Sequence, residues 1–158
     1  MTAPAATARQ NPTGVKLKDG YRTLVTFSSD PSISVWERSI NPPGLEGGDP
    51  VDTTTMHNDV WRSMSSRALV SMTEFSMEVG YDPIIFSDLL ALLNVETTVT
   101  VTFPDGSTLA FYGFLKNFAP GTLKEGEFPT ASVTVVPTNA DPTTGAEEAP
   151  VLVNVPGT

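Results

Sequence analysis

The 158-residue chain has no cysteine, a single histidine and few charged residues. Without cysteine it can form neither disulfides nor thiolate metal sites, and it has no thiol nucleophile. One imidazole excludes a metal site built from several histidines. Only 17% of the residues are charged, against roughly 25% in an average soluble domain. A surface this sparsely charged is consistent with burial against partners.

Basic residues are also scarce: 9 against 18 acidic ones, for a formal net charge of −9. This balance argues against a protein that holds nucleic acid or an anionic membrane by bulk charge. The start of the chain lacks a basic segment followed by an apolar run, so no secretory signal is expected. The longest apolar run, residues 89–93, is far shorter than the ~20 residues that span a bilayer. We therefore expect a soluble protein made in a cytoplasm, without a membrane partner.

What the chain does have is β-branched and alternating segments punctuated by 14 prolines and 12 glycines. Such segments predict strands, here at residues 21–28, 32–39, 67–81, 95–103, 107–118 and 127–137. A hairpin around Ser29-Asp30-Pro31 is expected to join the first two. In the longest, the more apolar face is expected to point to a core; its residues are Leu69, Ser71, Thr73, Phe75, Met77 and Val79. Residues 151–155 could add a short edge strand.

One segment, residues 83–93, has the apolar spacing of a helix. Asp82 is suited to cap it, Pro83 to its first turn, and Asn94 to a left-handed residue that closes it. The pattern places three leucines toward a core: Leu89, Leu90 and Leu93.

These elements predict a mainly β fold, an antiparallel β-sandwich or half-open barrel with one flanking α-helix. We expect a flexible N-terminal arm at 1–20, a β domain at 21–137 containing a long polar loop at 41–58, and a flexible C-terminal tail at 138–158. Loops of that length are usually functional or disordered.

No pattern of catalytic residues emerges. His57 could act as a base with Asp52 or Asp59, but the chain has no nucleophile-elbow motif, which favours a polar loop residue. Glu74 and Glu78 would be ~13 Å apart on one strand, too far for a glycosidase pair. Calcium-loop spacing and phosphate-binding glycine motifs are missing. We predict a protein that is not an enzyme and uses no metal or cofactor.

Three stretches together resemble a known family. They are residues 52–58 (DTTTMHN) followed by Trp61-Arg62, residues 73–81 (TEFSMEVGY) followed at once by Asp-Pro, and residues 99–115 with the closing segment 129–137. In this order they resemble the major tail tube proteins of long-tailed bacteriophages of the siphophage type, whose tails do not contract. The resemblance covers about residues 20–139.

The resemblance implies rings of six subunits, whose strands complete one continuous β-barrel around a lumen, and rings that stack into a helical tube. The lumen would hold the tape-measure protein during assembly and later conduct genomic DNA into the host without binding it specifically. Tail tip and terminator proteins would cap the tube. The protein would be assembled in the host cytoplasm and reside in the virion tail.

On this reading Glu74, Glu78 and Glu96 are candidates to face the lumen, where they would repel phosphate. Residues of the long loop are candidates for ring stacking: Leu45, Asp49, Asp52, Thr54, Met56 and His57. Two alternatives stay open. One is the tube of a contractile tail or secretion system; the other is a β-sandwich binding module, such as a capsid decoration or receptor-binding domain.

Overall fold

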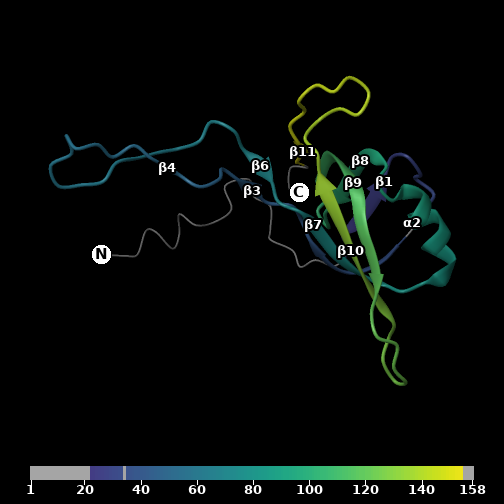
Figure 1. The fold of residues 1–158 in the computed structure, drawn as a ribbon. Helices are drawn as coiled ribbons and strands as arrows, with labels where there is room; N and C mark the ends of the chain where they lie inside the picture. The colour runs from purple at the N-terminus through teal and green to yellow at the C-terminus, as the bar shows by residue number, and fades with distance from the viewer. Residues whose placement is uncertain (1–21, 34, 155–158) are drawn as a thin grey trace, which may run out of the picture.

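The structure, a computed structural model, describes residues 22–33 and 35–154. Antiparallel strands and one short helix make up this part of the chain (Figure 1), which confirms the predicted mainly β class. Six strands of the main sheet follow one another in the order β1 (Leu24–Phe27), β8 (Glu96–Thr102), β9 (Thr108–Pro120), β10 (Thr130–Pro137), β7 (Phe75–Gly80) and β2 (Trp36–Asn41).

A seventh strand, β11 (Val151–Val153), lies on the edge of β9 that also holds β10. Pro137, at the end of β10, pairs with Gly113, and Val151 pairs with Ala110. β11 therefore continues the line of β10 after an excursion at residues 138–150. The edge strand that the sequence predicted at 151–155 is present in its described part.

Alternation along the strands builds the core. The predicted inward face of the longest segment is confirmed for Phe75, Met77 and Val79, which are all buried. It is wrong for the first half of the segment, where Leu69 is 81% exposed. Most inward positions of the neighbouring strands add another apolar side chain: Val99, Val101, Phe111, Leu115, Ala131, Val133 and Val135. Thr97 on β8 is a buried polar exception. Burial of this apolar surface is the main stabilising contribution to the fold.

The hairpin predicted around Ser29-Asp30-Pro31 is wrong. β1 pairs with β8 and β2 pairs with β7, so the two strands lie at opposite ends of the strand order. The Asp30 carboxylate accepts a hydrogen bond from the Ser32 backbone N–H at 3.2 Å. This local turn leads into buried Ile33 instead of returning along β1. As a result, the second strand begins at Trp36 and not at Ser32.

The predicted helix is present as a 3₁₀ turn, η1 (Pro83–Ile85), followed by α2 (Phe86–Leu92). Asp82 caps it, accepting a hydrogen bond from the Ile84 N–H at 3.0 Å. Asn94 has the expected left-handed backbone, with φ of 60°.

The inward face of this helix differs from the prediction. Leu89 is buried, but Leu92 is its core partner, while Leu90 and Leu93 are 61% and 37% exposed. Ile85, Leu89 and Leu92 face the core, at the i, i+4, i+7 spacing of one helical face. Phe86, Leu90 and Leu93 have the same spacing, so the periodicity of the sequence does not decide which of the two faces is buried.

A two-stranded arm projects from the body (Figure 1). At its base β3 (Leu45–Glu46) pairs with β6 (Ser71–Met72), and farther out β4 (Val51–Asp52) pairs with β5 (Met64–Ser65). The loop expected at 41–58 is thus the outgoing half of this arm.

The single long strand predicted at 67–81 is divided as a consequence. Its first residues belong to the arm, and β7 begins only at Phe75. Residues 75–80 are flanked by β2 and β10 and bury one face, whereas β6 pairs with β3 alone. The alternating pattern continues through both parts, so the break between the arm and β7 cannot be predicted from it.

Two further projections leave the body, the tip of the β9–β10 hairpin below and the excursion at 138–150 above (Figure 1). The arm predicted at residues 1–20 lies outside the described residues. Within them, neither helical segment is long and apolar enough to cross a membrane.

Candidate functional site

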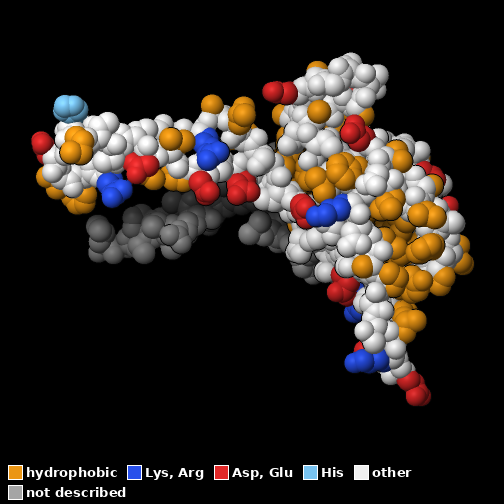
Figure 2. All heavy atoms as spheres, in the orientation of Figure 1, with side chains coloured by type: hydrophobic (Ala, Val, Ile, Leu, Met, Phe, Trp, Pro, Cys, Tyr) orange, Lys and Arg blue, Asp and Glu red, His pale blue; other side chains and the backbone are white. Residues whose placement is uncertain are grey.

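The part of the chain that the structure describes brings together no group of three or more His, Asp and Glu side chains that could hold a metal ion. His57 lies at the far end of the arm (Figure 2), where its backbone N–H donates to Thr55 Oγ1 at 3.3 Å. Its imidazole is exposed. The candidate functional features of the described residues are instead exposed surfaces suited to contacts with other proteins.

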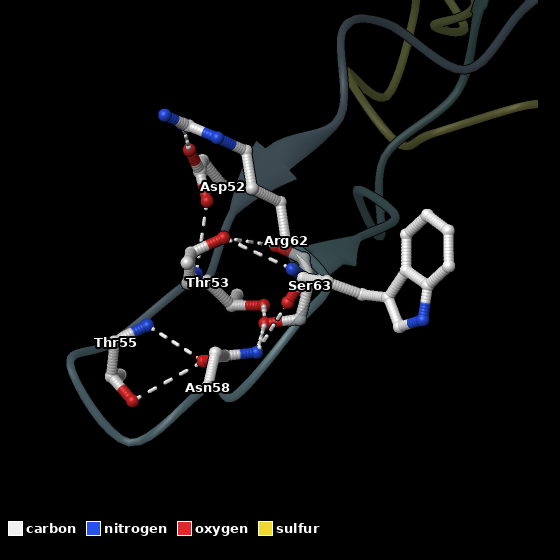
Figure 3. A network of polar contacts seen from close by, with 8 residues as sticks. Asp52, Thr53, Thr55, Asn58, Arg62 and Ser63 are labelled. Carbon is white, nitrogen blue, oxygen red and sulfur yellow. Dashed lines mark hydrogen bonds and ion pairs between the residues drawn. The ribbon is translucent and has the colours of Figure 1, made fainter.

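The turn at the end of the arm is held by its own polar contacts (Figure 3). Asn58 accepts a hydrogen bond from the Thr55 N–H at 2.9 Å and donates to the Trp61 carbonyl at 2.9 Å. The Ser63 N–H donates to Thr54 Oγ1 at 3.0 Å. These bonds explain the run of threonines followed by asparagine, because such side chains can hydrogen-bond the backbone N–H and C=O groups of a turn.

Asp52 anchors the start of this turn. Hydrogen bonds from the Thr54 side chain and then the Thr54 backbone hold the pKa of its carboxyl below the ordinary value, and Arg62 adds to the effect. The Thr54 N–H lies 2.9 Å from Oδ1, and Arg62 Nη1 lies 3.3 Å from Oδ2. Asp52 is therefore a charged acceptor that organises the tip.

The six stacking-loop candidates all lie on the arm, and the structure joins some of them. Asp52 and Thr54 share the tip network, while Asp49 accepts a 2.7 Å bond from Arg67 Nε through its backbone carbonyl. The arm also exposes a set of large apolar side chains: Leu45, Val51, Met56, Val60, Trp61, Met64, Leu69 and Val70. Only Leu45 and Met56 among these are stacking candidates predicted from the sequence. So much exposed apolar surface marks an interaction site.

The three lumen candidates lie on one face of the main sheet. Glu74 precedes buried Phe75, Glu78 follows buried Met77, and Glu96 precedes Thr97, whose side chain is also buried. Because strand residues alternate between faces, all three glutamates point away from the core. Small hydroxyl side chains share this outer face: Thr26, Ser76, Thr98, Thr100, Thr102, Thr108, Ser132 and Thr134. On β9 the face also carries Tyr112 and Phe114, the latter directly opposite Glu96.

Two of these glutamates are paired with cations. Lys116 Nζ lies 2.8 Å from Glu74 Oε1, and Arg38 Nη1 lies 3.8 Å from Glu78 Oε1. Neither ion pair is predicted from the sequence. Lys116 reaches Glu74 at a register shift between β9 and β10, and Arg38 lies at a similar shift in β2. No pattern in the sequence marks either irregularity.

Two hollows on the surface were also missed. The larger, about 420 Å³, is lined by Trp36, Glu37, Arg38 and Phe128. Its Phe128 ring lies against Gly80, where a Cβ would come within 2.9 Å of the ring. The Arg38 guanidinium carbon lies 5.2 Å from the centre of the same ring, within cation–π range. The second hollow, of about 180 Å³, runs beside α2.

Neither a protein-family model nor a curated protein sequence matches this chain. Solved structures do. A chain of the 6-fold symmetrised anti-feeding prophage (AFP) baseplate, determined by cryo-EM, is similar with a TM-score of 0.61 at 11% identity, over 87% of this chain and 96% of that one.

Two structures of gene transfer agent (GTA) particles are similar as well. A chain of the native virion has a TM-score of 0.57 at 12% identity, over 87% of this chain and all (100%) of that one. A chain of the tail of the empty particle, computed with helical refinement and C6 symmetry, has a TM-score of 0.53 at 13% identity, over 78% and 96%. The chain thus has a fold that occurs in chains of tail-like particles.

Proposed function

We propose that this chain is a structural subunit of a bacteriophage tail-type tube, in which rings of six copies stack around a central lumen. The observation that carries the proposal is the extent of the structural likeness. It covers 87% of this chain and 96–100% of the matched chains from the AFP baseplate and the GTA virion. The likeness is therefore one of whole chains, not of a shared fragment. At 11–12% identity this likeness shows the fold alone. The structural role in a tail tube is our inference.

The exposed face of the main sheet is the proposed lumen wall. Its hydroxyl side chains are short and uncharged, and its glutamates do not attract phosphate groups. Glu96 is the one of the three without an ion pair among the described contacts. Glu74 and Glu78 are each partly neutralised. DNA would pass along such a wall without specific binding, and the tape-measure protein would occupy the same channel during assembly.

The arm is the proposed stacking element. It reaches well beyond the body and exposes apolar side chains that its own chain does not cover. A neighbouring ring would bury them, together with the candidates Leu45, Asp49, Asp52, Thr54, Met56 and His57. Tail tip and terminator proteins would end the stack. The subunit would be assembled in the host cytoplasm and reside in the virion tail, without enzymatic activity.

Negative-stain electron microscopy of the purified protein tests this proposal. We expect rings or tubes with six-fold end views as the protein concentration rises. Assembly should depend only weakly on salt, because the proposed contacts are largely apolar. Particles that stay monomeric at every concentration and salt condition, with or without tail tip proteins, would contradict it. A contractile sheath encoded beside this chain would assign the tube to a contractile tail.

One observation favours a second function, a β-sandwich binding module. The hollow lined by Trp36, Arg38 and Phe128, at about 420 Å³, falls within the size range of ligand pockets. Such a module would be a stable monomer or trimer, and Trp36→Ala would abolish ligand binding without affecting assembly.

A further inference from the structure

The end of the arm presents its apolar side chains on a preformed turn. Met56 is 100% exposed and Trp61 is 82% exposed, and Val60 between them is exposed too. The hydrogen bonds of Asn58 hold the backbone on both sides of this group. Aromatic and methionine side chains are enriched at the centres of protein interfaces. A turn whose backbone is already held in place loses little conformational entropy when it binds.

The hollow beside α2 is an apolar groove with one cation at its rim. Phe86 and Phe118 form one side with ring centres 6.1 Å apart, and Leu89 is buried beneath. Leu90, Leu93, Lys116 and Asn117 complete the lining. At about 180 Å³ the groove is below the roughly 300–1,000 Å³ typical of small-molecule sites. Its size suits a single large side chain of a protein partner.

The arm and the groove lie on opposite sides of the molecule. Figure 1 places the arm to the left of the body and α2 to the right, and Figure 2 shows apolar side chains gathered at both places. The tip therefore cannot fill the groove of its own chain. A contact between unlike patches on opposite sides is heterologous, and repetition of it generates a ring or a helical filament.

We propose that the groove beside α2 receives the arm tip of a second copy of this chain, with Trp61 as the anchor. This inference deepens the proposed function and rests on it, because the tube supplies the arrangement in which one copy meets the next. Charge is compatible with the contact. Asp59 lies beside the apolar tip, and Lys116, which has three donors, uses one for Glu74. A further donor of Lys116 can bind the Asp59 carboxylate as the tip docks.

Because the chain has no cysteine, engineered cysteines test the contact directly. Val60→Cys on the tip and Leu90→Cys on the groove rim both replace exposed side chains, so the core is untouched. The two variants are mixed, one carrying a size tag, and oxidised. We expect the mixed disulfide to form at least about tenfold faster than in a control mixture of Val60→Cys with Thr143→Cys, since docking raises the effective thiol concentration.

A second measurement uses the anchor itself. We expect Trp61→Ala to raise the concentration at which assembly begins about tenfold or more, and Trp61→Phe to raise it less. Cross-linking no faster than in the control mixture overturns the docking proposal, even where tubes are seen by microscopy. Rapid cross-linking without any ring or tube supports the contact and instead contradicts the tube function.

Discussion

The backbone N–H of Val25 in β1 donates a 2.9 Å hydrogen bond to Oε1 of Glu37 in β2. These strands are the two ends of the strand order, so the sheet curls until its edges approach each other. An edge strand exposes unpaired backbone groups, and here a carboxylate from the opposite edge satisfies one of them. Glu37 thereby acts as a clasp across the opening of the half-barrel.

Removal of the clasp should destabilise the subunit. We expect Glu37→Ala to lower the free energy of unfolding by about 1–3 kcal/mol, because a hydrogen bond to a charged acceptor is lost and the Val25 N–H is left without that partner. Glu37→Gln retains an acceptor and should cost less. Urea denaturation measures both, with Glu96→Gln on the exposed sheet face as the control that changes charge alone. Equal stabilities for all three variants would refute the clasp.

Gly113 is required by close packing within the sheet. A Cβ at this position would lie 2.8 Å from the carbonyl oxygen of Val136, a backbone atom that cannot rotate away. We expect Gly113→Ala to destabilise the fold by about 1–3 kcal/mol through overpacking. In contrast, Gly47→Ala on the arm has nothing within 4 Å of the added carbon and should be near neutral. Thermal unfolding of the pair compares them directly.

The arm should be dispensable for folding but not for stacking. Gly44 and Thr73 face each other at its base, joined by a 2.9 Å backbone hydrogen bond. Replacing residues 45–72 with a short glycine–serine turn should therefore leave a folded, monomeric body. Circular dichroism and electron microscopy test this together. Full-length tubes formed by the shortened protein would rule out a stacking role for the arm.

The arm tip should be insensitive to mild acid. A carboxyl with a lowered pKa stabilises the folded form above its ordinary pKa, and that contribution is lost only as the pH falls through the lowered value. For Asp52 we thus expect the tip to persist below the ordinary pKa of roughly 3.9 and to loosen in stronger acid. The chemical shift of the Thr54 amide reports it by NMR, and Asp52→Asn should remove this pH dependence.

Charge reversal on the exposed sheet face should affect passage of DNA more than assembly. We expect Glu74→Lys and Glu78→Lys subunits to form tubes, while particles built from them eject DNA poorly, because added cations on the lumen wall attract phosphate. Glu125→Lys serves as the control, because it makes the same charge change near the tip of the β9–β10 hairpin. Normal infectivity of the Glu74→Lys, Glu78→Lys double variant would exclude these residues from the lumen.

The sequence predicted the features that depend on local chemistry. Alternation identified the buried face of β7, side-chain capping identified Asp82, and the tolerance of asparagine for a left-handed backbone identified Asn94. It failed wherever the outcome depended on partners distant in the chain. The separation of β1 from β2, the division of the segment at 67–81, and the Lys116–Glu74 pair all follow from tertiary pairing. The groove beside α2 was not predicted, because the apolar spacing did not show that Leu90 and Leu93 lie on the exposed side of the helix.

The alignment of β11 with β10 has a practical consequence for engineering. The sheet resumes in line after residues 138–150, so the length of that excursion is independent of the strand register on β9. Gly145 marks an open turn in it, with nothing within 4 Å of an added Cβ. Foreign peptides inserted there would be carried on the surface of the subunit while the edge of β9 stays paired on both sides of the graft.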